Sequence, residues 1–223
     1  KVRRLYLEVA EQLEKLIKNR EISPGDRLPS ERDLAERFGV SRPSIREAMI
    51  ALEIAGLVEI RTGSGIYVKD VPETVSLAID DFPGPFELLE ARRLIEAEVV
   101  ALAAQRITDE QLAELEQALR DMEREDKDGS ISEEADQRFH CIIAEAAENS
   151  ALGSIVRWLW ALRNRSEIST YFHQRVREKG VHPSIKEHID IYNVIKAPNA
   201  AAARQAMITH ISNAIEADYK VTN

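Results

Sequence analysis

The chain has 223 residues, of which 44% are hydrophobic, and its formal net charge at pH 7 is −9. This length suffices for two modest domains. The sequence contains no run of about 18 apolar residues and only one cysteine, Cys141. It therefore predicts neither a membrane span nor a disulfide framework, and we expect a cytoplasmic protein.

The charge is distributed unevenly along the chain. Residues 1–70 hold 13 Lys and Arg against 12 Asp and Glu, whereas residues 71–223 hold 17 against 27. Binding to nucleic acid depends on Lys and Arg, because these side chains neutralise phosphates. The first part is therefore compatible with a DNA-binding module, joined to an acidic second domain.

The first 70 residues predict three helices and a two-stranded ribbon. Apolar residues recur with helical spacing over 5–17, which indicates the first helix. A short second helix follows Ser30, a good N-cap residue, and ends at Gly39, because glycine accepts the left-handed conformation. The third helix follows Ser41 and ends at Gly56, so only a tight turn separates these two helices.

After the third helix the apolar pattern changes to a period of two, over 57–60 and 66–68. The turn between these two segments is rich in glycine, as a hairpin requires. Two helices around a tight turn, followed by such a hairpin, are typical of a winged helix-turn-helix domain. We assign residues 1–70 to this domain and the proline-rich residues 71–85 to a linker.

Residues 86–223 predict a second domain that is entirely helical. Helical patterns cover 86–105, 108–126, 132–148, 151–178, 183–196 and 198–219. The predicted fold class is therefore mostly α, with a winged helix-turn-helix and its small β-hairpin followed by an all-α helical bundle.

The start of the third helix carries hydrogen-bond donors that suit DNA. In a helix-turn-helix this end enters the major groove, where Arg can form two hydrogen bonds with guanine. Candidate contacts, all expected to be exposed, are Arg32, Ser41, Arg42, Ser44 and Arg46. Thr62 in the hairpin turn adds a small donor beside glycines that allow close approach to a groove. Any single arginine also fits a solvated helix face, but the agreement of spacing, caps and hairpin favours DNA binding.

Two stretches resemble the signature of a known family. Residues 24–35 read PGDRLPSERDLA and residues 40–48 read VSRPSIREA, which is similar to the N-terminal region of GntR-family bacterial transcription regulators. The resemblance implies a homodimer that binds double-stranded operator DNA. It also implies that Arg32, Arg42 and Arg46 contact this DNA, together with Thr62 and Gly63.

Four polar residues of the second domain predict a metal site. Asp136 and His140 are four residues apart, so they share one helix face. His188 and His210 lie beside apolar residues on their own helices and are expected to face the interior. Burying these groups unpaired would cost much free energy, and a divalent metal would satisfy all four. Taken singly, each histidine also fits a hydrogen-bonded core or surface residue.

The second domain resembles the helical effector domain of FadR-type members of the same family, the FCD domain. The likeness rests on residues 90–96 (EARRLIE) and on the spacing of the four polar residues above. It implies that these four residues coordinate a divalent ion, which helps to hold a small organic acid. Zinc is favoured, with nickel and manganese as alternatives, because the ligand types do not decide among them.

The same likeness implies that Arg92 binds the carboxylate of the effector, since a guanidinium can form two hydrogen bonds with it. The alternative for Arg92 is an ion pair with Glu96 on the outside of the helix. Arg93 would serve if the helix register were shifted by one residue.

The expected function is a transcription regulator, most simply a repressor, that a small carboxylate effector releases from DNA. Residues 92–106 and 136–154 are most similar to regulators of sugar-acid use, although regulators that respond to lactate share the pocket. One alternative is a metal-dependent hydrolase fused to a DNA-binding domain. The sequence has no His-Glu-x-x-His helix to support it, so we expect no enzyme activity. A third possibility is an architectural DNA-binding protein without an effector.

Overall fold

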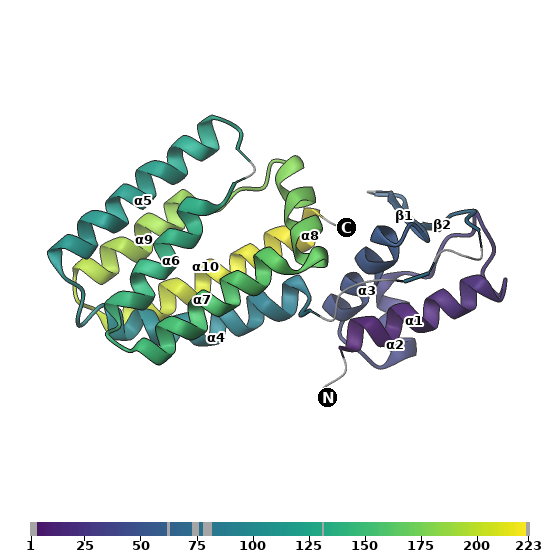
Figure 1. Cartoon of the computed structure of the whole chain (residues 1–223), viewed down its shortest axis with the longest axis horizontal. Coiled ribbons are helices and arrows are strands. Elements are labelled where there is room, and N and C mark those ends of the chain that lie inside the picture. The colour runs from purple at the N-terminus through teal and green to yellow at the C-terminus, as the bar shows by residue number, and fades with distance from the viewer. Residues whose placement is uncertain (1–3, 62, 73–75, 78–81, 131, 222–223) are drawn as a thin grey trace. The chain divides into compact units, whose positions relative to one another are not determined.

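The computed structural model describes residues 4–61, 63–72, 76–77, 82–130 and 132–221 (Figure 1). Contacts divide the chain into two compact units. The N-terminal unit contains the chain up to Glu87 together with Asn164–His173, and the helical unit contains Leu88–Arg163 and Gln174–Val221.

The N-terminal unit has the predicted winged helix-turn-helix fold. Its elements are α1 (Leu5–Lys18), α2 (Glu31–Phe38), α3 (Arg42–Ile54), β1 (Val58–Arg61) and β2 (Gly65–Val68). The two strands pair antiparallel, with Val58 opposite Val68. Helix α3 packs against both α1 and α2, and the core residues between them include Tyr6, Leu13, Leu34, Ile45 and Leu52.

The predicted cap residues define the ends of α2 and α3. The Ser30 hydroxyl accepts a hydrogen bond from the backbone N–H of Asp33, and the Ser41 hydroxyl accepts one from that of Ser44, each at 3.2 Å. Gly39 adopts a φ of 65° at the end of α2. These caps satisfy backbone groups that a helix end leaves without partners, and they set the tight turn between the two helices.

The second part of the chain is all-α, as predicted. Its helices are α4 (Pro85–Ala103), α5 (Asp109–Lys127), α6 (Glu134–Ala146), α7 (Ser150–Arg165), α8 (Glu167–Glu178), α9 (Ile185–Lys196) and α10 (Ala200–Val221). Residues 85–87 of α4, 164–165 of α7 and 167–173 of α8 belong to the N-terminal unit. Large buried residues of the helical core include Leu115, Phe139, Val156, Trp160, Ile191 and Met207.

One predicted helix is wrong. The continuous helix expected over 151–178 is divided into α7 and α8 at Ser166. The Ser166 hydroxyl accepts a hydrogen bond from the backbone N–H of Ser169 at 3.3 Å. A side chain that satisfies this N–H caps a new helix, and neither Gly nor Pro marks the break in the sequence.

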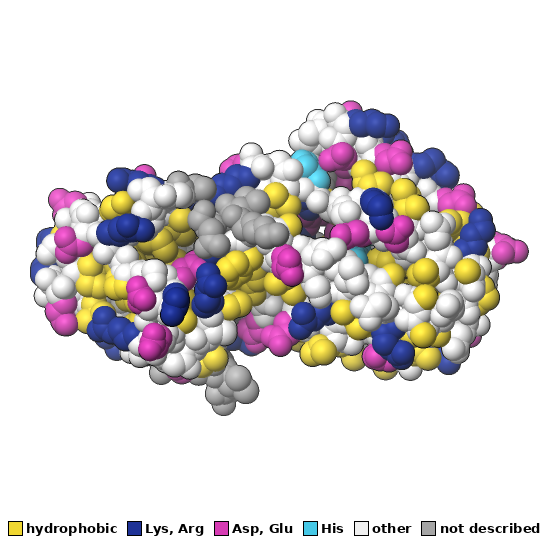
Figure 2. Space-filling model, turned by 180° about the vertical axis from the view of Figure 1, so that it is seen from behind, with side chains coloured by type: hydrophobic (Ala, Val, Ile, Leu, Met, Phe, Trp, Pro, Cys, Tyr) yellow, Lys and Arg dark blue, Asp and Glu magenta, His cyan; other side chains and the backbone are white. Residues whose placement is uncertain are grey.

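Charged groups of both signs are interspersed on the surface. On the face that Figure 2 shows, Lys and Arg side chains alternate with Asp and Glu, and hydrophobic side chains reach the surface between them. No helix in the described ranges is long and apolar enough to span a membrane.

Candidate DNA-binding surface and metal centre

The start of α3 presents part of the predicted DNA-binding set. Arg32, Ser41 and Arg42 are exposed, and the side chain of Arg42 is 52% exposed. Ser44 is partly buried, and its hydroxyl lies 2.9 Å from that of Ser41. Arg42 is therefore the arginine of α3 that is positioned for a partner outside the chain.

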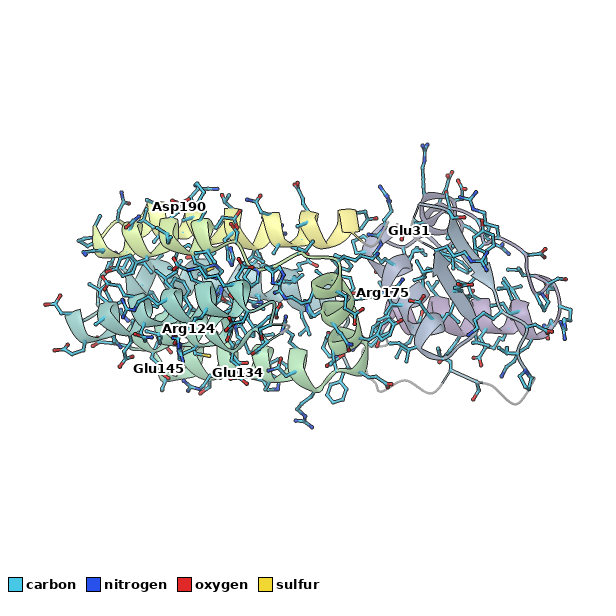
Figure 3. All side chains as sticks on the ribbon, turned by 90° about the horizontal axis from the view of Figure 1, so that it is seen from above. Glu31, Arg124, Glu134, Glu145, Arg175 and Asp190 are labelled. Atoms are coloured by element: carbon cyan, nitrogen blue, oxygen red, sulfur yellow. The ribbon has the colours of Figure 1, made fainter. Side chains whose placement is uncertain are left out.

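Arg46 differs from the expectation, because its side chain is only 2% exposed. Its Nε donates to Oε1 of Glu31 and its Nη2 to Oε2, each at 2.8 Å. Glu31, labelled in Figure 3, lies in the first turn of α2. This two-pronged ion pair joins α2 to α3, so the prediction that Arg46 is exposed is wrong for this conformation.

The wing offers one residue that the sequence interpretation missed. Gly63 is exposed with a φ of 73°, whereas Thr62 lies outside the described residues. Arg61 is exposed at the end of β1, pairs with Glu59 at 2.7 Å, and has its guanidinium carbon 4.6 Å from the Tyr67 ring centroid. Its position beside the turn adds a cation to this edge of the unit.

Glu47 is a buried carboxyl group for which the sequence pattern gave no signal. Its Oε1 accepts hydrogen bonds from the backbone N–H of Phe86 at 2.9 Å and from that of Glu87 at 3.3 Å. A Cβ atom at Gly84 would lie 2.3 Å from the Glu47 carboxyl carbon, so a larger residue there would displace this carboxyl group. Burial disfavours the charged carboxylate and raises the pKa of Glu47 to about 7.

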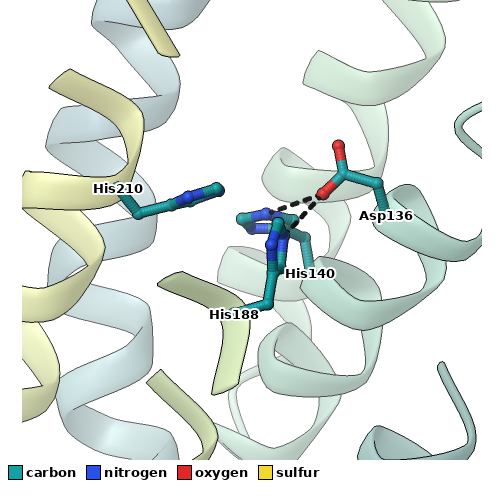
Figure 4. A group of neighbouring side chains, drawn as sticks. All are labelled: Asp136, His140, His188 and His210. Carbon is teal, nitrogen blue, oxygen red and sulfur yellow. Dashed lines mark hydrogen bonds and ion pairs between the residues drawn. The ribbon is translucent and has the colours of Figure 1, made fainter. Parts of the chain in front are cut away.

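The four predicted metal ligands come together inside the helical unit. Asp136 and His140 lie on α6, His188 on α9 and His210 on α10 (Figure 4). All four are buried, and one ligand atom from each lies within 4.8 Å of the others. Oδ1 of Asp136 is 2.8 Å from Nε2 of His188 and 3.5 Å from Nε2 of His140. Three imidazoles and one carboxylate thus form a cluster that can hold a metal.

Each imidazole also has a partner for its Nδ1 atom. Nδ1 of His188 lies 2.9 Å from the carbonyl oxygen of Ser184, and Nδ1 of His210 lies 3.0 Å from Oε2 of Glu187. Nδ1 of His140 contacts Oε2 of Glu96. A tautomer with its proton on Nδ1 would leave the Nε2 lone pair to a metal, the arrangement that most histidine ligands share.

The charges in the cluster favour a bound cation. Burial opposes ionisation of Asp136, but hydrogen bonds from His140 and His188 outweigh it and hold its pKa well below the usual range. Burial and the nearby His188 lower the pKa of His210 to about 4. An ionised carboxylate beside the neutral imidazole of His210 suits a divalent metal. Burial lowers the pKa of His140, but Glu96 and Asp136 outweigh it and raise that pKa to about 8, so His140 would lose a proton when a metal binds.

Arg92 faces the interior, in agreement with the register of the prediction. Its Nε donates to Oε1 of Glu96 at 2.7 Å, and its guanidinium carbon lies 3.9 Å from the Trp160 ring centroid. The ion pair with Glu96 exists, but it is buried and not on the outside of the helix. Burial opposes ionisation of Glu96, yet Arg92 and His140 prevail and lower its pKa to about 2. Glu96 therefore links Arg92 to His140, a predicted metal ligand, and its spacing did not reveal this contact.

A winged helix-turn-helix joined to a helical domain with a buried His/Asp cluster defines a class of DNA-binding transcription regulators. Comparison with known families agrees with this. Residues 5–68 match the family described as bacterial regulatory proteins, gntR family, and residues 87–213 match the FCD domain. The chain belongs to the GntR family and is of its FadR type. These families and the similar curated proteins are transcription regulators and not enzymes.

The similarity to individual proteins extends over nearly the whole chain. The Uxu operon regulator of Haemophilus influenzae is 37% identical, over 95% of this chain and 81% of that protein. The regulator LutR of Bacillus subtilis is 36% identical, over 89% of this chain and 94% of its own. A solved Streptococcus agalactiae GntR structure is similar with a TM-score of 0.51 and 31% identity, over 95% of this chain and 99% of that chain.

Proposed function

We propose that the protein is a dimeric repressor that a small carboxylate effector releases from operator DNA. The observation that carries this proposal is the buried cluster of Asp136, His140, His188 and His210, in which every Nδ1 atom has a partner and one ligand atom of each residue lies within 4.8 Å of the others. Bacterial operators lie in the cytoplasm, so the protein acts there.

In this proposal the four residues hold a divalent metal, for which zinc is our first choice and nickel or manganese are alternatives. When bound, the metal supplies a Lewis acid with coordination positions open to a carboxylate. Arg92 reaches the same carboxylate. One of its five N–H groups is used by Glu96, so the guanidinium keeps donors for a ligand.

The effector belongs to the sugar acids or hydroxy acids. Support comes from the names of similar proteins, since Uxu and Exu operon regulators stand beside LutR and an L-lactate dehydrogenase operon regulator. The chemistry of the cluster agrees, because a metal and a guanidinium both favour a carboxylate.

Operator contacts come from the start of α3 and from the wing. Ser41 and Arg42 are exposed at the start of α3, where Ser44 follows, and Arg32 is exposed on α2. Thr62 and Gly63 follow β1 in the chain. Arg46 can contribute only when Glu31 releases it, because the Glu31 carboxylate accepts from both Nε and Nη2 of the guanidinium.

The second copy in the dimer would cover an apolar face on α4 and α7. Leu94 and Trp158 are the two most exposed large apolar side chains among the described residues, at 65% and 59%. Exposed Glu90 on α4 and Arg157 on α7 have opposite charges, so packing α4 of one copy on α7 of the other about a two-fold axis would pair them.

Metal analysis of the purified chain tests the core of this proposal. We expect about one equivalent of divalent metal per chain, which is lost in Asp136→Ala and His188→Ala and retained in His182→Ala. His182 is a matched control because it lies outside the cluster. A thermal shift with sugar or hydroxy acids should disappear together with the metal. Wild-type protein that takes up no metal after reconstitution would refute the metal site.

A further inference from the structure

A second polar cluster lies next to the metal ligands. Glu133 directly precedes α6, so Glu133, Asp136 and His140 follow one another at spacings of three and four residues and share a helix face. The carboxylate of Glu133 is buried between Arg163 of α7 and Arg177 of α8, and it contacts both guanidinium groups. Although Glu133 occupies the N-cap position, its side chain makes no capping hydrogen bond. The Glu133 side chain therefore does not cap α6 but pairs with the two arginines.

Trp160 lies next to both this second cluster and the proposed metal ligand His140. Its ring centroid is 5.5 Å from that of His140, 3.9 Å from the Arg92 guanidinium carbon and 5.3 Å from that of Arg163. The side chain is fully buried, and its Nε1 atom has no hydrogen-bond partner among the described residues. A buried indole N–H usually finds an acceptor, because leaving it without one costs free energy. A bound molecule can supply this acceptor.

The hydrogen-bond donor and acceptors of this second cluster match those of a hydroxyl group. The indole N–H can only donate, whereas the Glu133 carboxylate can only accept and retains acceptor sites beyond its two arginine contacts. A hydroxyl group can do both, accepting from Trp160 and donating to Glu133. A second carboxylate on the ligand would be repelled by Glu133 and would have no proton to donate.

The distance along α6 suits a ligand with several carbons. At 1.5 Å per residue, Glu133 lies about 4.5 Å from Asp136 and about 10 Å from His140 along the helix axis. An acid held on the His140 side of the metal would need several carbons to extend to Glu133, which a three-carbon acid lacks and a six-carbon chain has.

We propose that Trp160 and Glu133 form a subsite that binds hydroxyl groups at the far end of a polyhydroxy acid, whose carboxylate lies at the metal. Arg163 and Arg177 position Glu133 and balance its charge. The inference rests on the proposed function and deepens it, because it selects sugar acids over short or unsubstituted acids as the effector class.

Calorimetric titration of the metal-loaded full-length chain tests this subsite. The probes are three six-carbon sugar acids (D-gluconate, D-glucuronate and D-galacturonate), with L-lactate and hexanoate for comparison. We expect wild-type protein to bind at least one sugar acid roughly tenfold or more tightly than hexanoate. Trp160→Phe keeps the aromatic ring but loses the N–H, and should weaken sugar-acid binding about tenfold, the effect of one lost hydrogen bond. Binding of lactate should change less than about twofold.

Glu133→Gln provides an independent variant, and Glu114→Gln, on the exposed side of α5, is its matched control. Glu133→Gln should weaken sugar-acid binding, while Glu114→Gln should bind as wild type does. The subsite is refuted if both Trp160→Phe and Glu133→Gln bind sugar acids like wild type, or if Trp160→Phe weakens lactate equally. If wild type binds lactate but no sugar acid, the subsite is wrong and the proposed function stands. If it binds no acid at all, both are wrong.

Discussion

Arg42 and Arg46 show how two residues of one type, a helical turn apart, come to differ. Both lie near Glu31, but only Arg46 forms two short hydrogen bonds with it, whereas Nη2 of Arg42 is 4.0 Å from its Oε2. The sequence indicates that arginines gather at this helix end. It cannot indicate which one an acid on the preceding helix will bind, since that depends on the packing of α2 against α3.

The two arginines should therefore respond differently to substitution. Arg42→Ala should weaken operator binding by about 1–3 kcal/mol and leave stability nearly unchanged, because the side chain is exposed. Arg46→Ala should lower the free energy of unfolding by about 1–3 kcal/mol, because Glu31 loses a charged partner. Denaturant unfolding measures the stability of each variant, and titration with operator DNA at one salt concentration measures its binding. Equal loss of stability in the two variants would contradict this distinction.

Glu47 gives the N-terminal unit a pH dependence with a definite sign. Burial raises the pKa of Glu47 in the folded protein to about 7, above that of an exposed carboxyl group in the unfolded chain. The contribution of Glu47 to stability is therefore full at pH below about 4.5 and is lost as pH rises to about 7.

The variant Glu47→Gln should remove this dependence. The amide oxygen of Gln can still accept from the backbone N–H groups of Phe86 and Glu87, but the side chain cannot ionise. At pH 8 we expect the variant to be more stable than wild type by about 2 kcal/mol, with a smaller difference at pH 5. Unfolding in denaturant at the two pH values checks this, and a difference independent of pH would show that Glu47 is not buried as described.

At the scale of helices, periodicity and cap residues predicted most of the fold. Ser30, Gly39 and Ser41 define their helix ends through local hydrogen bonds, and such signals are readable along the chain. The break at Ser166 was missed because, although its hydroxyl makes the same kind of local bond, no Gly or Pro before it marks the end of α7. The spacing of Asp136 and His140 was informative because it is also local. The partners of the histidine Nδ1 atoms lie in other turns and helices, so spacing did not reveal them.

The pairing of α9 with α10 positions one of the metal ligands. Glu187 on α9 accepts from Nδ1 of His210 on α10, and Asn213 contacts its other oxygen. Glu187→Ala should lower metal affinity roughly 10- to 100-fold while leaving all four ligands in place, since loss of an orienting partner has this effect. Competition with a chelator measures the affinity, with Glu114→Ala as the control. Unchanged affinity in Glu187→Ala would mean that the partner of His210 does not orient it.

For the whole molecule, the charge pattern and the two family matches agree that the chain has a DNA-binding part and an effector-domain part. The nearly neutral residues 1–70 contain the helix-turn-helix, and the acidic remainder contains the helical domain. Sequence patterns alone did not identify the surface that we propose to lie between two copies, because an exposed apolar residue is recognised only once burial is known.

The proposed dimer makes a prediction about mass. Leu94→Glu and Trp158→Glu place charges on exposed positions of α4 and α7, so the fold of each chain should be retained while association is lost. Light scattering should then report the mass of a monomer, and operator binding should weaken. Ile189→Glu on α9 is the control, since it also adds a charge at an exposed apolar site. A dimer that persists in both variants would place the interface elsewhere.

We propose that an acid bound at a metal controls binding to DNA. The most direct test of this proposal is the dissociation constant for a duplex selected from a random pool, measured with increasing sugar acid on metal-loaded and on metal-stripped protein at one salt concentration. We predict that the acid weakens DNA binding about tenfold or more in the metal-loaded protein and has no effect in the metal-stripped protein. An affinity that is constant at every acid concentration, or that responds equally without metal, would contradict the claim.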